Sequence, residues 1–404
     1  MIKQVATLIR RFDKIYRVAT RELSKYLDIA IHFIKPKNRY LNIINQNNCV
    51  LIITHDLGGG SDFYLQNIIK QFIEQNQACL IMISHPAGYK LKYRDRNQSF
   101  WVLISSLIKL ETQIQFNQIE RIFLNNYVRG REPIQLIHFL LHIKAKHSTP
   151  IIIALHDFFP ICPSYPLIND EKQYCAIPSD INRCENCRLH NPYNQYQHIT
   201  ITAWRKAWEI MLIQANEIKC FSDSSCELLL KAYPVLNKTG NISIIPHSVA
   251  HIHAPIKLKT SKTLHIGIVG NISSLHKGVH LVKDMLKLMK QHNMKTHITV
   301  IGSAFQLADD EQLTVLGAYQ IDQLANIITN TNITVFFLPS IWPETFSYVT
   351  HELIQLNVPV AVFDLGAQAE AIKKYKKGYV IPKIDANTAL EHLQLFHKQI
   401  NGCE

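Results

Sequence analysis

One stretch near the C-terminal end, VFFLPSIWPETFSYVTHELIQLNVPVAVFDLG, constrains the fold of this chain more than any other part of the sequence. It begins and ends with short apolar runs, Val335–Leu338 and Val358–Phe363, which are typical of strands buried on both faces of a parallel sheet. Between these runs, apolar residues recur at helical spacing, namely Val349, Leu353 and Leu356. Thr345 is a natural N-cap for that helix. The stretch therefore predicts a strand, a helix and a parallel strand, the unit from which α/β folds are built.

Two glutamates frame this turn and helix, Glu344 in the turn and Glu352 on the helix, with seven residues between them. A helix that begins at the carboxyl end of a parallel strand presents free N–H groups and its positive dipole end to an anion such as phosphate. Glu352 lies at the edge of the apolar stripe, where a carboxylate needs a partner, and ribose hydroxyls would serve. The alternative interpretation is a solvated helix glutamate beside a turn glutamate with local partners.

The same alternation of apolar runs and helical patterns fills the rest of the chain. In the first part, strands are predicted at Cys49–Thr54, Cys79–Ile83, Trp101–Ile104, Ile119–Leu124, Pro150–Leu155, Ile218–Phe221 and Ile242–Ile245. Helices are predicted between them at Phe63–Glu74, Glu132–Lys146 and Trp204–Gln214, and after Ser222 or Asp223 as a cap. The second part has predicted strands at Leu264–Gly270, His297–Ile301, Thr314–Gly317 and Ile333–Leu338, and a last helix at Asn387–Gln399.

The length of 404 residues is sufficient for two domains with cores of their own. Residues 248–262 are polar, carry lysines and show no periodicity, as expected of a linker between domains. We therefore divide the chain into an N-terminal segment (1–48), a first domain (49–247), the linker and a second domain (263–404). The composition, 47% hydrophobic and 18% charged, is ordinary for a globular protein, and no apolar run approaches the ~20 residues of a membrane-spanning helix.

The charge balance indicates an anionic partner, because the formal net charge is +12. Basic residues in the N-terminal segment recur among apolar ones: Arg10, Arg11, Lys14, Arg17, Arg21 and Lys25. This pattern predicts a basic amphipathic helix, which either lies on an anionic membrane surface or packs on its own protein. No long lysine and arginine run and no nucleic-acid motif is present, so we expect phosphates and a membrane surface rather than nucleic acid. Nine cysteines, with no secretory signal at the N-terminus, indicate the reducing cytosol.

Candidate site residues follow three of the predicted strands. Gly59 and Gly60 lie in HDLGGGSDF, where glycines allow the backbone to approach a ligand, although a plain turn is the alternative. His156 comes directly after PIIIAL, at the edge of an open α/β sheet where ligands bind. Gly270 ends LHIGIVG, and Lys277 follows it with a charge suited to a diphosphate; a surface lysine is the alternative.

A cysteine-rich insertion spans residues 160–192, directly after His156. It contains Cys162, Cys175, Cys184 and Cys187, the last two as Cys-x2-Cys, and His190 could replace one of them. Four thiolates can fix a loop with little apolar content around a tetrahedral Zn²⁺. The alternative is a set of reduced thiols, because a single Cys-x2-Cys pair is half of a zinc signature.

The Glu-x7-Glu spacing inside PETFSYVTHEL, followed by VPVAVFDLG, resembles the donor-site signature of retaining GT-B glycosyltransferases of the family 4 (group 1) type. The resemblance implies an α/β fold with two doubly wound, Rossmann-like domains facing across a cleft. It implies that Glu344 faces the donor sugar and that Glu352 holds the ribose of the nucleotide. THDLGGGSD resembles the glycine-rich loop that lines the cleft, and HDFFPICP resembles the stretch whose histidine, here His156, reaches the transferred sugar.

The segment LHIGIVGNISSLHKG resembles the family's phosphate-clamping loop, with Lys277 at the position of the lysine. The arginine that the family places after the first glycine is replaced by Asn271. With His156 and Glu344 as catalytic residues, the implied donor-binding residues are Gly59, Gly60, Gly270, Asn271, Lys277, Ser303, Tyr319, Thr345, Phe346, Ser347 and Glu352. Such transfer requires no metal cofactor for catalysis, so any zinc in the insertion would be structural.

The expected function is transfer of a sugar, with retention, from a nucleotide-sugar donor to a glycan or lipid-linked acceptor, in cell-surface polysaccharide or lipopolysaccharide synthesis. We expect a cytoplasmic enzyme, also at the inner face of the cytoplasmic membrane. The runner-up is a catalytically silent GT-B scaffold that binds nucleotide or glycan, which Asn271 favours slightly. A basic zinc-bearing nucleic-acid-binding protein and a phosphorylase-like enzyme are further alternatives.

Overall fold

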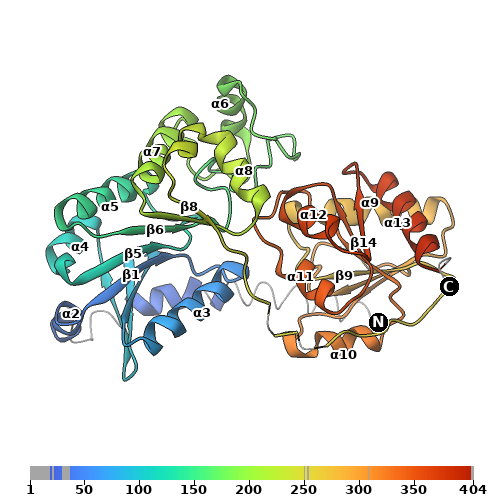
Figure 1. Ribbon diagram of the computed structural model, residues 1–404, viewed down its shortest axis with the longest axis horizontal. Coiled ribbons are helices and arrows are strands. Elements are labelled where there is room, and N and C mark those ends of the chain that lie inside the picture. Colours follow the sequence, from blue (N-terminus) through green and yellow to red (C-terminus); the bar gives the residue numbers. More distant parts are fainter. Residues whose placement is uncertain are drawn as a thin grey trace.

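The computed structural model describes residues 19–20, 22–29, 37–249, 251–252, 254–307 and 309–401. They form two α/β domains that lie side by side along the long axis of the molecule (Figure 1). An eight-stranded sheet forms the centre of the first domain, and a six-stranded sheet forms the centre of the second. The prediction of two doubly wound α/β domains is therefore confirmed.

The first sheet has the strand order β4-β3-β2-β1-β5-β6-β7-β8. Its strands are β1 (Cys49–Thr54), β2 (Ala78–His85), β3 (Gly88–Arg94), β4 (Ser99–Ile104), β5 (Ile119–Leu124), β6 (Ile151–Ala154), β7 (Glu217–Cys220) and β8 (Ile242–Ile244). All pairings are parallel except those of β3 with β2 and β4. The sequence analysis missed β3, because GYKLKYR alternates buried residues with charged ones instead of forming an apolar run.

Helices cover both faces of this sheet (Figure 1). They are α2 (Lys37–Asn45), α3 (Gly60–Glu74), α4 (Leu107–Gln113), α5 (Pro133–His147), α6 (Ile181–His190), α7 (Ile201–Gln214) and α8 (Asp223–Ala232), with 3-10 turns at Phe116–Gln118 and Pro234–Lys238. Ser222 caps α8, as predicted, because its side chain accepts a hydrogen bond from the Ser225 amide. The α6 helix was not predicted and lies inside the cysteine-rich insertion.

The second sheet is wholly parallel, in the order β11-β10-β9-β12-β13-β14. Its strands are β9 (His265–Val269), β10 (His297–Ile301), β11 (Leu313–Val315), β12 (Val335–Leu338), β13 (Val360–Phe363) and β14 (Gly378–Ile381). The helices are α9 (Val279–Gln291), α10 (Leu324–Thr329), α11 (Tyr348–Gln355), α12 (Gly366–Lys373) and α13 (Ala386–Asn401), with 3-10 turns at Leu275–Lys277 and Ile321–Gln323. The strand order reverses between β9 and β12, the point where open α/β sheets bind ligands.

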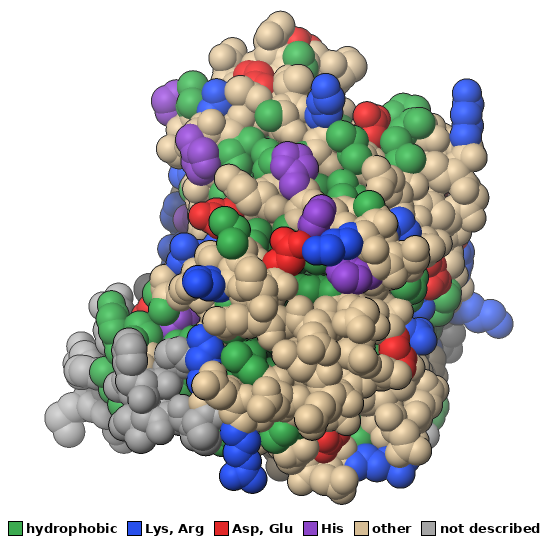
Figure 2. Space-filling view, turned by 90° about the vertical axis from the view of Figure 1, so that its left-hand side faces the viewer, with side chains coloured by type: hydrophobic (Ala, Val, Ile, Leu, Met, Phe, Trp, Pro, Cys, Tyr) green, Lys and Arg blue, Asp and Glu red, His purple; other side chains and the backbone are tan. Residues whose placement is uncertain are grey.

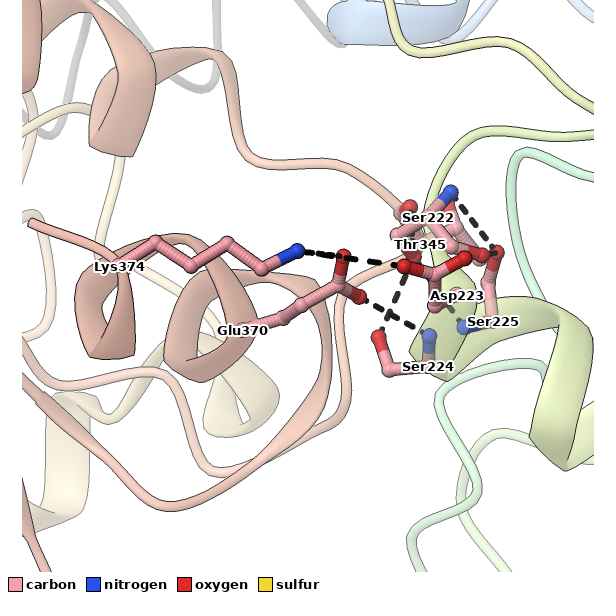
Figure 3. Close-up of polar contacts among 7 residues, drawn as sticks. All are labelled: Ser222, Asp223, Ser224, Ser225, Thr345, Glu370 and Lys374. Atoms are coloured by element: carbon pink, nitrogen blue, oxygen red, sulfur yellow. Dashed lines mark hydrogen bonds and ion pairs between the residues drawn. The ribbon is translucent and has the colours of Figure 1, made fainter.

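The two domains contact each other directly at the start of α8 (Figure 3). The Ser222 hydroxyl donates to the carbonyl oxygen of Thr345 at 2.8 Å. The Ser224 amide donates to the carboxylate of Glu370 on α12 at 3.0 Å, and Lys374 lies 3.4 Å from the same carboxylate. A carboxylate from one domain therefore accepts a hydrogen bond at the positive end of a helix in the other.

Most of the predicted basic helix lies outside the described residues, including Arg10, Arg11, Lys14, Arg17 and Arg21. Lys25 lies in a described helical stretch, 22–29, and pairs with Glu22 at 2.9 Å. Among the residues that the structure describes, no helix is both long enough and apolar enough to cross a membrane. On the face of the molecule in Figure 2, lysine and arginine side chains are interspersed with acidic and histidine side chains.

Candidate active site

A cavity of about 270 Å³ lies between the two domains. Loops that follow β1, β5 and β6 form one wall, and loops that follow β9 and β12 form the other. Residues predicted from the sequence that line it are Gly59, Gly60, His156, Lys277, Glu344, Thr345 and Phe346. Carboxyl ends of strands from both sheets thus meet at one site, as expected for two doubly wound domains.

The glycine-rich loop brings the backbone of the first domain close to the second. Gly58 and Gly59 have φ values of 76° and 90°, in the left-handed region that favours glycine. A Cβ atom on Gly60 would lie 3.1 Å from the ring of Tyr348, on α11 of the other domain. The loop therefore requires small residues where it faces the donor side of the cavity.

His156 is held in place from several sides. Its Nε2 lies 3.0 Å from Oδ1 of Asn125, and its ring stacks on Phe221 with centroids 4.7 Å apart. Burial, and then the neighbouring rings of His247 and His55, lower the pKa of His156 well below its usual value. The ring is therefore neutral at pH 7, and it can exchange hydrogen bonds with a sugar hydroxyl without carrying a positive charge.

Glu344 is the centre of a buried charged network. Its Oε1 lies 2.6 Å from Nζ of Lys277 and accepts a hydrogen bond from the Ser340 hydroxyl, also at 2.6 Å. Burial opposes a charge on this carboxyl, but Lys277 and hydrogen bonds from Ser340 and Ser347 outweigh it and lower the pKa of Glu344. The site therefore holds a carboxylate anion beside a lysine cation, and the Lys277 Nζ also lies 5.6 Å from the ring centroid of Trp342.

The prediction that Thr345 caps α11 is wrong. The N-cap is Ser347, whose side chain accepts from the Thr350 amide, so the helix begins two residues later. Both residues carry a hydroxyl suited to an N-cap, but the side chain of Thr345 bonds to the other domain. Its hydroxyl donates to the carbonyl oxygen of His156 at 2.8 Å. Phe346 likewise faces the first domain, where its ring lies 4.7 Å from that of His247.

The loop after β9 lies against the start of α11. A Cβ on Gly270 would lie 3.8 Å from Val349, in the first turn of that helix. A Cβ on Gly302 would lie only 2.0 Å from the carbonyl oxygen of Gly270, so this position has room only for glycine. Gly270 has a φ of 105°, which also favours glycine. Ser303 accepts a hydrogen bond from the Ile272 amide at 2.9 Å through its carbonyl oxygen. The exposed Asn271 accepts from the Ser273 amide at 3.0 Å and shapes the turn.

Glu352 lies on α11, 3% exposed, outside the lining of the cavity. Its Oε1 lies 2.9 Å from Nε2 of His251, in the stretch predicted as a linker, while its buried Oε2 has no hydrogen-bond partner. Burial raises the pKa of Glu352, against the effect of His251. Burial, and then the charge of Glu352, raise the pKa of Tyr319, which lies near this carboxylate. The oxygen without a partner indicates that a ligand binds here, because buried acceptors are rarely left without a hydrogen bond.

The sequence analysis missed several residues at the site. His276 and Trp342 line the cavity beside Lys277 and Glu344, and the two rings lie 5.4 Å apart. Both residues are close in sequence to Lys277 and Glu344, and this closeness could have indicated that they belong to the site. His251 had no such signal, since 101 residues separate it from Glu352.

The four cysteines of the insertion line a second cavity, of about 420 Å³, away from the first. His190 does not line it. Across the described part of the chain, no three histidine, cysteine, aspartate or glutamate side chains are already arranged to hold a metal ion. The zinc prediction therefore stays a prediction.

The second domain matches a known family. Residues 252–400 match the family model described as glycosyl transferases group 1. This range runs from within the predicted linker to the last turn of α13 and includes Lys277, Glu344 and Glu352. A search of curated protein sequences found no match to the chain.

Solved structures match across both domains. Sucrose-phosphate synthase from Thermosynechococcus elongatus is 13% identical, with a TM-score of 0.57, over 86% of this chain and 89% of that one. An α,α-trehalose-phosphate synthase (UDP-forming) from Burkholderia vietnamiensis is 10% identical, with a TM-score of 0.52, over 87% and 95%. Anabaena HepE in complex with UDP-glucose is 14% identical, with a TM-score of 0.51, over 87% and 94%. The chain therefore has the GT-B fold, and its residues 252–400 form a domain of the glycosyl transferases group 1 family.

Proposed function

We propose that this chain transfers a sugar from a nucleotide-sugar donor to a glycan or lipid-linked acceptor, with retention at the anomeric carbon. The observation that carries the proposal is the pair of buried glutamates beside β12 and α11. Glu344 is ionised and paired with Lys277 at the cavity, while Glu352 has a buried oxygen with no partner. A nucleotide sugar has complementary groups for both: a diphosphate for the lysine and ribose hydroxyls for the free oxygen.

The nucleotide would lie along the second domain. The ribose would donate a hydroxyl hydrogen bond to Oε2 of Glu352, with His251 holding the other carboxylate oxygen in place. Tyr319, near this carboxylate, would contribute to the pocket for the base. The diphosphate would lie over Gly270 and the first turn of α11, whose free N–H groups stabilise negative charge.

The chemistry would depend on electrostatic stabilisation of the leaving diphosphate. Lys277 and the start of α11 would oppose the negative charge that grows as the bond to the sugar breaks. The Glu344 carboxylate would face the sugar, where positive charge develops. The neutral His156 on the opposite wall would orient the sugar through hydrogen bonds. On this proposal the transfer step would require no metal.

A uridine diphosphate sugar is the first donor to test. The structure of HepE is a complex with UDP-glucose, and the trehalose-phosphate synthase is named as UDP-forming. The acceptor would enter from the first domain, past the glycine loop and Asp157, both of which line the cavity. We propose a cytoplasmic enzyme of cell-surface polysaccharide or lipopolysaccharide synthesis at the inner membrane face; the free thiols of the eight described cysteines fit a reducing compartment.

The test is release of nucleoside diphosphate from a panel of nucleotide sugars by the wild type and by Glu344→Gln. Removal of the charge should reduce turnover by about 100-fold or more, in line with the loss of one electrostatic stabiliser. Glu391→Gln, on the exposed face of α13, is the matched control and should retain full turnover. Nuclear magnetic resonance of the product would establish retention. Equal turnover by Glu344→Gln and wild type would overturn the assignment.

A further inference from the structure

The cysteine-rich insertion contains a second cavity that the proposed transfer reaction does not use. Cys184 and Cys187 lie three residues apart on α6, and Cys162 and Cys175 lie in the loop before it. All four are free thiols, and all four line this cavity of about 420 Å³. Cysteines separated by up to 25 positions in sequence are thus gathered around one space.

The helix that carries two of these cysteines is held by polar contacts rather than by apolar burial. The Thr202 amide donates to Glu185, and Arg188 donates to the carbonyl oxygen of Gln197. None of the side chains of α6 is buried, although the loop before it contributes Leu167, Ile168 and Ile177 to the core of the first domain. The loop has no regular element beyond an isolated bridge between Ile168 and Tyr174. Apolar packing therefore fixes the loop but not α6, and the four thiols lie where the two parts face each other.

Each of the four sulfur atoms receives a hydrogen bond from an N–H group. The amide of Ser164 donates to Cys162 and the amide of Ile177 donates to Cys175, in each case from two residues further along the chain. Asn191 donates its side-chain N–H to the sulfur of Cys187 at 3.4 Å. Arg205 donates to the sulfur of Cys184 at 3.8 Å. Sulfur is a weak acceptor as a thiol and a much better one as a thiolate, so these donors suit four thiolates.

The lining of the cavity carries charges of both signs. Arg183, Arg188 and Arg205 line it together with Asp170, Glu171 and Asp180, and Arg205 is the cation that donates a hydrogen bond to one of the four sulfur atoms. Four thiolates around one divalent cation carry a net charge of about −2, which nearby guanidinium groups would stabilise.

We propose that Cys162, Cys175, Cys184 and Cys187 bind one Zn²⁺ as a structural site that fastens α6 to the preceding loop. The four thiols would release their protons as the metal binds. Since the described side chains are not arranged around one point, binding would require rotation of the four cysteine side chains and movement of α6 relative to the loop. This proposal does not depend on the sugar-transfer function.

The site would also support the wall of the interdomain cavity. The hydroxyl oxygen of Tyr193, three residues after α6, lies 3.0 Å from Nδ1 of His276 in the second domain. Tyr165, between Cys162 and Cys175, packs edge-on against Trp342, with ring centroids 6.4 Å apart. Loss of the metal would loosen both contacts beside Lys277, so the acceptor side of the cavity would lose its order.

The decisive experiment is metal analysis of the full chain purified under reducing conditions with zinc present. We expect one zinc per chain, no visible absorbance, and release of that zinc to a colorimetric chelator when the thiols are modified. Cys184→Ser and Cys187→Ser should bind less than a tenth of that zinc. Removal of zinc from the wild type should lower its melting temperature by roughly 5–10 °C. Cys226→Ser, at a buried cysteine of α8 outside the cavity, is the matched control and should retain its zinc.

Cys187→His provides a variant that keeps a ligand, since imidazole can replace a thiolate on zinc, and it should retain most of the metal. This variant separates loss of a ligand from loss of the fold. Wild-type protein without zinc after this purification would overturn the proposal. Disulfides between the four cysteines, detected by mass spectrometry, or an iron chromophore would overturn it equally.

Discussion

Lys277 and Glu344 form one ion pair at the interdomain cavity, with Nζ and Oε1 2.6 Å apart. Each residue was predicted from the sequence as a separate contact of the donor, and 67 positions separate them. Their pairing means that the site is electrostatically balanced before a donor binds. A diphosphate would then attract the lysine, and Glu344 would be left to face the sugar with its full charge.

This pair leads to the first prediction, which concerns Lys277→Met. The variant should lose about 100- to 1,000-fold in turnover, because the leaving diphosphate loses its cation. It should also lose about 1–3 kcal/mol of stability, because the buried Glu344 carboxylate loses its partner. Addition of Glu344→Gln should recover the stability but not the turnover. Thermal unfolding and donor cleavage, measured on both variants, check the two statements separately.

Lys287→Met is the control for that experiment, because Lys287 pairs with Asp284 at an exposed site, with 74% of its side chain accessible. It should change stability by less than about 0.5 kcal/mol. A double variant as unstable as Lys277→Met alone would contradict the role given to the pair.

The second prediction concerns the ribose contact. Glu352→Ala should raise the KM for the donor by about 10- to 100-fold, which is the worth of hydrogen bonds to a charged group. The kcat should change less, because this contact would exist in both the ground state and the transition state. Steady-state kinetics with the preferred donor provide the measurement. A variant with an unchanged donor KM would remove Glu352 from the binding site.

The third prediction concerns the pH dependence of stability at Asp157, which is 8% exposed beside His156. Burial raises the pKa of Asp157 from 3.8 to about 6, against hydrogen bonds from the Phe159 amide and Asn126. The folded protein therefore holds this proton more tightly than the unfolded chain, and stability falls as pH rises from about 4 to about 6. The loss should be on the order of 2–3 kcal/mol and should disappear in Asp157→Asn.

Asp385 should change the stability of the protein with pH in the opposite direction to Asp157, and the same experiment measures both. Burial opposes its charge, but hydrogen bonds from Thr388 and Lys383 outweigh burial and lower the pKa of Asp385. Its contribution is present above its usual pKa of 3.8 and is lost as pH falls through the folded value. Melting temperatures of wild type, Asp157→Asn and Asp385→Asn between pH 2 and pH 7 would show the two trends. Parallel curves for the three proteins would contradict the assignment.

The fourth prediction concerns the contact between the domains. Glu370→Ala removes the acceptor for the Ser224 amide. It should therefore weaken the contact between the two domains by about 1 kcal/mol. The donor KM should then rise by up to about fivefold, because a smaller fraction of the protein has the two domains in the arrangement that binds the donor. Glu227→Ala, at an exposed position of the same helix α8, should change neither. Small-angle scattering should show a larger radius of gyration only for the Glu370 variant; equal radii would indicate that this contact does not control closure.

The sequence predicted elements where apolar residues are continuous. β1, β6 and β12 are such runs, and the structure places all three strands in the predicted sheets. Elements without that signal were missed. β3, next to the edge strand β4 of the first sheet, alternates lysines with buried side chains, and α6 has no buried side chain. Its cap, Asp180, precedes no apolar stripe that would have marked a helix.

Some of the predicted site residues lie together at the cavity and others have unexpected partners, because the sheet topology determines the first group and contacts between distant loops determine the second. Lys277, Glu344 and His156 meet because the carboxyl ends of parallel strands gather at one edge. The choice between Thr345 and Ser347 as the cap depended on a hydrogen bond to His156, which is 189 positions away. The partnership of His251 with Glu352 likewise depends on how the linker returns to α11. Local sequence patterns contain no information about such contacts.

The most direct test of the central claim is a thermal-shift screen of the purified chain against UDP, GDP, ADP, CMP and dTDP sugars. We predict that one nucleotide class raises the melting temperature selectively and that Glu352→Ala abolishes the shift. Such a result would establish a donor site at α11 and identify the base. No stabilisation by any nucleotide sugar at millimolar concentration would contradict the account.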